Sequence, residues 1–164
     1  MATVADEALL LALLNSAPLA DGVAQEELTD DASARAWLAG RAPEVGPLRA
    51  AELRAARAAL AAVVRGAASP VSLAPLLDGV VRRPVLTADG LEWTLEGDSA
   101  VVRAVLAWDA LRAGAPGRLR PCANADCALF LIDRSRANNA RWCSMAACGN
   151  RMKARRHYER VRHA

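Results

Sequence analysis

Apolar residues recur at helical spacing through much of the first two thirds of the chain. Residues 47–64 carry them at three- and four-residue intervals, which predicts a long helix. Residues 5–16 are apolar on most sides and predict a short helix, and a further helix is expected over residues 30–41 with Trp37 and Leu38 facing inward. Thr29 or Asp30 has the side chain expected of an N-cap for the second helix. Proline and glycine separate the three segments, so we expect loops between them.

The apolar period shortens to two near the middle of the chain. Residues 81–87 and 91–95 alternate apolar side chains with polar or small ones on either side of an Asp-Gly turn, which predicts a β-hairpin. A further helix is expected over residues 99–112. We expect Leu106 and Trp108 to be among the residues that this helix buries.

Glycine and proline cluster at residues 114–117, and the sign of the charge changes there. We therefore expect a mainly α N-terminal domain with a β-hairpin over residues 1–116, and a second domain over residues 117–164. Residues 118–164 contain eleven Lys and Arg and three Asp and Glu, which gives a net charge of +8. Residues 1–117 contain ten Lys and Arg and fifteen Asp and Glu, which gives a net charge of −5. This asymmetry indicates an anion-binding segment on an acidic body.

All the cysteines of the chain lie in this basic segment and form two C-x4-C pairs, fifteen residues apart. Four thiolates can close a tetrahedral shell around one Zn²⁺, and a closed shell makes the metal structural rather than catalytic. We therefore expect one structural zinc ion. Its predicted ligands are Cys122, Cys127, Cys143 and Cys148.

Other roles for the cysteines fit the pattern less well. Their paired spacing argues against inert core residues, and disulfides would require an exported chain. The apolar run at residues 8–14 follows two acidic residues and is too short to span a bilayer. We therefore expect a cytoplasmic protein without a membrane anchor. An iron–sulfur cluster and a redox switch based on the thiolates remain as alternatives.

The residues around the cysteines predict an α+β finger of treble-clef-like order. The first pair lies at the two ends of a tight turn, and residues 128–132 follow as a strand. We expect a loop over residues 133–140, and Arg141 and Trp142 as a second short strand. Ser144 is the expected N-cap of a final helix whose first turns contain the last cysteine.

Several motifs in this segment together resemble the CGNR zinc finger. They are residues 122–127 (C-x4-C), 130–136 (FLIDRSR), 141–145 (RWCSM) and 148–153 (CGNR-x-K). The preceding residues are similar to the N-terminal domain called ABATE, with an apolar segment ending at Asn15, an arginine-bearing long helix, a hairpin and a helix. The resemblance implies a bacterial, stress-linked transcription regulator with a DNA-binding finger.

The final helix is expected to present a basic face. At 100° per residue, Lys153, Arg156 and Arg160 share one side, opposite a predicted packing stripe that includes Tyr158 and Val161. Such a face suits a phosphate backbone or a major groove. The predicted nucleic-acid contacts are Arg134, Arg136, Lys153, Arg155, Arg156 and Arg160.

Three polar residues near the cysteines are expected to support the finger instead. Asn150 would donate a hydrogen bond to a thiolate or to the turn beside it. Arg151 would hold Asp133 or a backbone carbonyl.

These residues favour a transcription regulator that binds DNA through the finger and the basic helix. One finger makes a small interface, so we expect useful affinity to require a homodimer or a protein partner. The alternatives are a protein-interaction module that meets an acidic partner, such as RNA polymerase or another regulator, and a zinc-thiolate redox sensor. The sequence has no paired catalytic carboxylates, phosphate loop or nucleophile motif, so we do not expect an enzyme.

Overall fold

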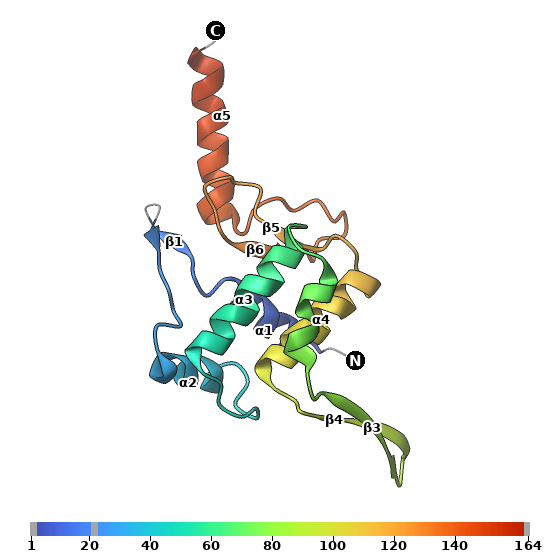
Figure 1. Ribbon diagram of the computed structural model, residues 1–164. Coiled ribbons are helices and arrows are strands. Elements are labelled where there is room, and N and C mark those ends of the chain that lie inside the picture. Colours follow the sequence, from blue (N-terminus) through green and yellow to red (C-terminus); the bar gives the residue numbers. More distant parts are fainter. Residues whose placement is uncertain (1–2, 21–22, 163–164) are drawn as a thin grey trace.

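Helices dominate the chain, with three short antiparallel hairpins among the described residues (Figure 1). The structure is a computed structural model that describes residues 3–20 and 23–162, except the side chains of Ala20 and His157. It confirms the mixed α+β composition expected from the sequence. In chain order the elements are α1 (Val4–Leu14), β1 (Leu19–Ala20), β2 (Val23–Ala24), α2 (Asp31–Ala39), α3 (Ala50–Val64), η1 (Pro70–Leu77), β3 (Val81–Thr87), β4 (Gly90–Glu96), α4 (Ala100–Gly114), β5 (Leu119–Pro121), β6 (Phe130–Ile132), η2 (Met145–Gly149) and α5 (Asn150–Arg162).

Side-chain caps begin α2 and α4, and the cap of α2 is one of the two residues predicted for it from the sequence. The carboxylate of Asp30 accepts a hydrogen bond from the backbone N–H of Ser33 at 2.8 Å and starts α2. The hydroxyl of Ser99 accepts from the N–H of Val102 at 3.2 Å and starts α4. Each cap satisfies a backbone donor that the first helical turn leaves without a partner.

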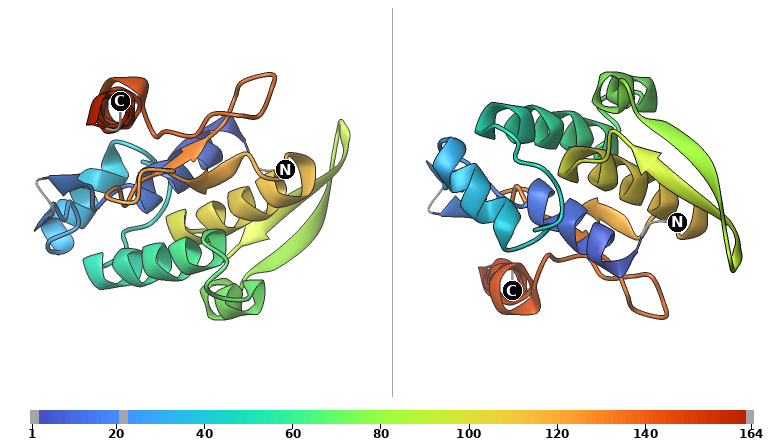
Figure 2. Two further views of the ribbon diagram at one scale, coloured as in Figure 1. Left: turned by 90° about the horizontal axis from the view of Figure 1, so that it is seen from above. Right: turned by 90° about the horizontal axis from the view of Figure 1, so that it is seen from below.

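Helix α1 lies at the centre of the fold and packs against α3, α4 and β6 (Figure 2). Apolar residues occupy most of its sides, and a helix of this kind must be covered on most sides. Leu10 and Leu13 of α1 are almost fully buried, as are Leu53 and Leu60 of α3. The core of the protein is therefore built around a short helix of leucines.

Helix α4 buries three alanines in this core beside Val101, Val105 and Leu111. Ala100, Ala104 and Ala107 recur at helical spacing and are buried, so α4 can approach α1 closely. The prediction that Leu106 faces inward is wrong, because the alanine side takes the inward position and leaves Leu106 39% exposed. Trp108 is half-buried against the edge of the core.

The C-terminal segment shares the hydrophobic core of the helices. Phe130 of β6 is 2% exposed and belongs to the same cluster of buried residues as α1, α3 and α4, with Leu119 and Ile132 packed against it. The predicted boundary between residues 116 and 117 therefore separates two parts of one continuous core. Among the described residues, no helix is long and apolar enough to cross a membrane.

Two polar side chains of the helical part attach β6 to it. The Asn15 amide accepts a hydrogen bond from the N–H of Phe130 at 2.8 Å and donates one to its carbonyl at 3.1 Å. Asn15 thus replaces a neighbouring strand at the edge of β6. From the end of α3, Arg65 places its guanidinium 4.3 Å from the centre of the Phe130 ring and donates to the carbonyl of Ala128 at 2.8 Å.

Replacing Asn15 by alanine should loosen the attachment of β6. The substitution leaves the N–H and carbonyl of Phe130 without their partners, so we expect a loss of about 1–3 kcal/mol in the free energy of unfolding. Denaturant unfolding measures it. Asn139→Ala is the matched control, because Asn139 is exposed and the change should stay within about 0.5 kcal/mol. Equal losses in the two variants would contradict the role of Asn15.

Candidate metal centre and nucleic-acid interface

The four cysteines converge from two turns that lie far apart in the sequence. Cys122 follows β5 directly, and Cys127 lies in the turn that leads to β6. Cys143 precedes the helical turn η2, and Cys148 lies within it. The sulfur atoms of all four lie within 4.8 Å of one another.

The spacing of the sulfur atoms fits a single tetrahedral metal ion. Around a zinc ion with Zn–S bonds of about 2.3 Å, tetrahedral thiolates lie about 3.8 Å apart. The Cys127 and Cys143 sulfurs are separated by 3.8 Å, and those of Cys143 and Cys148 by 3.7 Å. A disulfide needs sulfurs about 2.05 Å apart, and all four residues are free cysteines.

N–H groups donate hydrogen bonds to the sulfur atoms of the cluster. The backbone N–H of Cys143 donates to the sulfur of Cys122 at 3.4 Å, and the side-chain amide of Asn124 donates to the sulfur of Cys148 at 3.5 Å. Asn124 is buried within the first cysteine turn. Sequence reasoning assigned this role to Asn150, which is exposed at the start of α5. The position of Asn124 between the paired cysteines was the signal that could have found it.

The protein environment acts unequally on the thiols. Burial, followed by the neighbouring cysteines, raises the pKa of Cys143, and burial also raises the pKa of Cys127. Burial acts in the same direction on Cys148, but hydrogen bonds from Asn124 and the other cysteines outweigh it and lower its pKa. A metal ion must therefore displace protons from this set, so its affinity increases with pH.

The turn that carries Cys148 connects the metal centre to the final helix. The hydroxyl of Ser144 accepts from the N–H of Ala147 at 3.1 Å, which confirms the predicted N-cap. The turn η2 is a single π-helical turn that runs directly into α5. A Cβ atom at Gly149 would lie 2.6 Å from the Met145 sulfur and 3.3 Å from the Trp142 ring, so a larger residue there requires the Met145 side chain to move.

Residues 118–161 match the family model of the CGNR zinc finger. The match and the geometry agree: the four cysteines form a zinc-binding site for one structural Zn²⁺. A comparison with curated proteins finds no match. The similarity of the preceding residues to the ABATE domain stays a prediction.

The hairpin of the CGNR finger differs from the predicted one. Strand β6 pairs with β5, which precedes the first cysteine, so that Phe130 lies opposite Pro121. The prediction of a strand at Arg141 and Trp142 is wrong. That segment reaches the first cysteine turn through one hydrogen bond, from the N–H of Ala123 to the carbonyl of Arg141 at 2.8 Å.

Asp133 organises the loop between the two cysteine pairs. Its buried carboxylate accepts from the backbone N–H groups of Ser135 at 2.8 Å and Ala140 at 2.7 Å, and from the guanidinium of Arg120. Hydrogen bonds from Ser135 and Ala140, together with the charge of Arg120, lower the pKa of Asp133 to about 2. The partner of Asp133 is therefore Arg120 of β5 and not Arg151, which is exposed on α5.

The two arginines of this loop are exposed, and one of them faces the helical part. Arg134 forms an ion pair with Glu7 of α1 at 2.8 Å, so its charge is partly neutralised by the body. Arg136 is exposed at the loop surface. The contact of either residue with nucleic acid stays a prediction.

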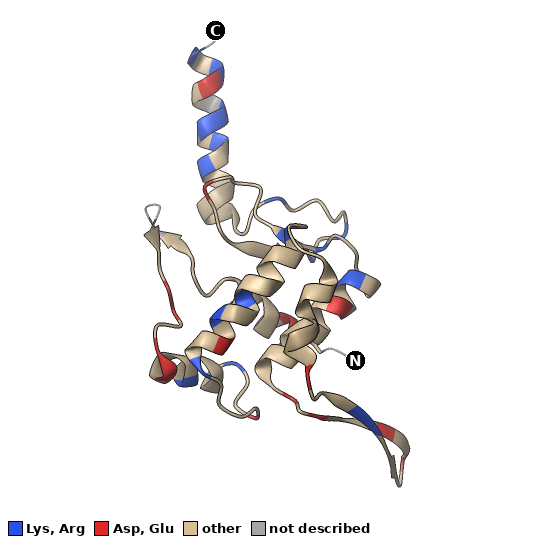
Figure 3. Ribbon diagram, viewed as in Figure 1, with Lys and Arg blue, Asp and Glu red and all other residues tan. Residues whose placement is uncertain are grey.

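Helix α5 projects from the rest of the molecule (Figure 3). The predicted packing stripe is wrong, because Tyr158 is 69% and Val161 63% exposed. Sequence reasoning assumed that the less polar side of the helix must be buried. In the structure the main contact of α5 with another element is with η2, the turn that precedes it.

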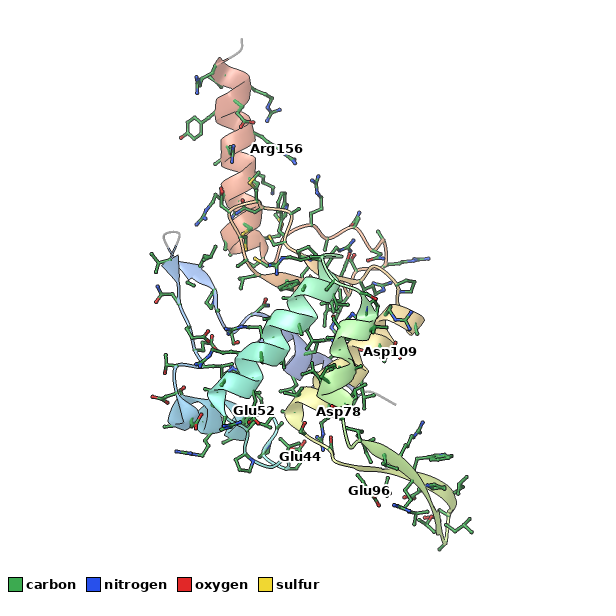
Figure 4. The ribbon with its side chains drawn as sticks, in the orientation of Figure 1. Glu44, Glu52, Asp78, Glu96, Asp109 and Arg156 are labelled. Carbon is green, nitrogen blue, oxygen red and sulfur yellow. The ribbon has the colours of Figure 1, made fainter. Side chains whose placement is uncertain are left out.

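The predicted basic face of α5 lies on this projecting helix. Lys153, Arg156 and Arg160 are all exposed, and among the described side chains none of the three forms an ion pair. Figure 4 shows Arg156 on the projecting helix. Arg155 differs, because it pairs with Glu159 at 3.1 Å and lies 4.0 Å from Asp126. The helix thus carries three cations whose charges are available to an outside partner.

Proposed function

We propose that this protein is a bacterial transcription regulator that binds DNA through its CGNR zinc finger and helix α5. The observation that carries the proposal is the face formed by Lys153, Arg156 and Arg160, which projects from the body without ion-pair partners among the described side chains. In this proposal the protein is not an enzyme, and the zinc ion acts by holding α5 in place.

The dimensions of α5 support binding in a DNA groove. Its 13 residues correspond to a length of about 20 Å, and the major groove of B-DNA is about 12 Å wide and accepts an α-helix. Phosphates on either side of the groove would meet the basic face, while Arg136 on the finger loop could reach the backbone beside it. The acidic charge of residues 1–117 would keep the rest of the molecule away from DNA.

A salt titration of DNA binding tests the proposal. Zinc-loaded protein is titrated with a duplex of random sequence at several salt concentrations, and fluorescence anisotropy reports the binding. If about five phosphates are neutralised, the plot of log affinity against log salt concentration should have a slope of about −4 to −5. A slope near zero, or no binding at low salt, would contradict the proposal and favour a protein partner for the basic face.

A further inference from the structure

The segment before Cys143 carries an exposed arginine that is held by an aromatic ring. The guanidinium of Arg141 lies 5.4 Å from the centre of the Trp142 ring. A guanidinium within about 6 Å of an aromatic ring is attracted to the face of that ring. Among the described residues, the side chain of Arg141 forms no hydrogen bond or ion pair. The ring therefore orients this cation without neutralising its charge.

The backbone on both sides of Trp142 is tied to the metal centre. The carbonyl of Arg141 accepts a hydrogen bond from the N–H of Ala123, in the first cysteine turn, at 2.8 Å. The N–H of Cys143 donates to the sulfur of Cys122 at 3.4 Å. The zinc finger therefore fixes the position of Arg141 as well as that of α5.

Trp142 places Arg141 on the side of the final helix that carries the basic face. A Cβ atom at Gly149 would lie 3.3 Å from the ring of Trp142, so the ring packs against the chain at this residue. Gly149 directly precedes α5. At 100° per residue it falls within about 40° of each residue of the basic face, Lys153, Arg156 and Arg160. The basic face therefore continues toward Arg141.

The carboxylates of the finger are engaged with other arginines. Residues 118–164 contain three, those of Asp126, Asp133 and Glu159. Arg155 lies 3.1 Å from Glu159 and 4.0 Å from Asp126. Arg120 forms an ion pair with Asp133. No carboxylate of the finger therefore pairs with Arg141 or with the basic face.

We propose that Arg141 binds a phosphate of duplex DNA and extends the basic face of α5 to the base of the helix. This inference rests on the proposed function, because it adds a contact to the same interface. A guanidinium presents a planar fork of N–H donors that suits phosphate oxygens. Stacking on the Trp142 ring uses the face of the guanidinium and leaves the donors at its edge free. Arg141 supplies one of the roughly five phosphate contacts expected for the interface.

The position of Arg141 lengthens the basic surface along the helix axis. The basic face alone spans about 10 Å, from Lys153 to Arg160. From Gly149, where Trp142 packs, to Arg160 the helix rises by about 16 Å. The major groove is about 12 Å wide, so cations at the two ends of the longer surface reach phosphates on both sides of the groove. Arg141 provides the contact at the end where α5 meets the finger.

Titrations of a duplex of random sequence with zinc-loaded full chain, followed by fluorescence anisotropy at several salt concentrations, test this role. Arg141→Ala should raise the dissociation constant about fivefold at physiological salt. It should also make the slope of log affinity against log salt concentration less negative by about 1, because one phosphate contact is lost. Arg141→Lys retains the charge and should keep the wild-type slope. Because Arg141 is exposed, both variants should retain zinc and the wild-type melting temperature.

Arg151→Ala is the matched control. Arg151 is exposed on α5, on the side of the helix opposite the basic face, so the variant removes the same charge from the same finger. Its dissociation constant should change by less than about twofold, because a charge on the far side acts only through screened attraction. Equal effects of the two alanine substitutions would overturn the inference. Loss of zinc from Arg141→Ala would also overturn it, since Arg141 would then support the metal centre.

The failure of this inference can be distinguished from the failure of the proposed function. If the wild type does not bind duplex DNA, the proposed function is wrong and the role of Arg141 is wrong with it. If the wild type binds with the expected salt slope and Arg141→Ala has the same affinity and slope, only the role of Arg141 is wrong.

Discussion

Removal of zinc should unfold the finger and lower the thermal stability of the whole protein. Structural zinc sites contribute an apparent binding free energy of about 10–16 kcal/mol at neutral pH, and this energy is available only to the folded finger. Few other contacts hold η2 and α5 in place, since α5 packs mainly on η2. Because Phe130 belongs to the core of the helices, unfolding of the finger should also lower the melting temperature of the remainder.

The prediction is checked with a ligand variant and a neighbour. Cys148→Ser removes a buried sulfur ligand, and Ala146→Ser introduces the same side chain at an exposed position of the same turn. Metal analysis should give one zinc ion per chain for the wild type and for Ala146→Ser, and less for Cys148→Ser. Circular dichroism should show loss of helix in Cys148→Ser and in the chelated wild type. An unchanged melting temperature after complete loss of zinc would contradict a structural role for the metal.

Loss of the basic face should nearly abolish DNA binding without disturbing the fold. We expect the triple substitution of Lys153, Arg156 and Arg160 by alanine to weaken binding about 100-fold at physiological salt, if each phosphate contact contributes about 1 kcal/mol. The salt dependence should change with it. Three fewer phosphate contacts reduce the slope from about −4.5 to about −2.

A charge-matched variant separates this effect from net charge. Arg35, Arg49 and Arg112 are exposed on the helical part, far from α5 in sequence, and their replacement by alanine removes the same charge. This variant should bind DNA almost as tightly as the wild type and with the same salt slope. Both variants should retain zinc and melt near the wild-type temperature. If the two triple variants lose the same affinity, the assignment of the interface to α5 is wrong.

The support of the finger shows where reasoning from the sequence reached its limit. Asn150 and Arg151 were assigned supporting roles because they follow Cys148 closely, yet Asn124 and Arg120 perform those roles. Asn124 precedes Cys148 and Arg120 precedes Asp133, and each reaches its partner across a turn or a strand pair. Hydrogen-bond partners of this kind depend on which strands pair, and the pairing of β5 with β6 was not predicted.

The attachment of the finger to the helices could not be predicted from the local sequence pattern either. Asn15 and Phe130 are 115 residues apart, and an asparagine at the end of an apolar helix predicts a helix end rather than a strand contact. The exposed position of α5 has a related cause. The periodicity of α5 shows that one side of the helix is less polar than the other. Whether another element covers that side depends on where the rest of the chain folds.

The sequence by itself determined the types of the main elements, the basic charge of the last third and the four cysteine ligands. These features depend on periodicity, composition and short spacings, which act within a few residues. The tertiary structure decided that the finger shares one core with the helices and that α5 projects with its cations available. Each of these features depends on contacts between segments that are distant in the sequence. Such contacts form only when the whole chain has folded around α1.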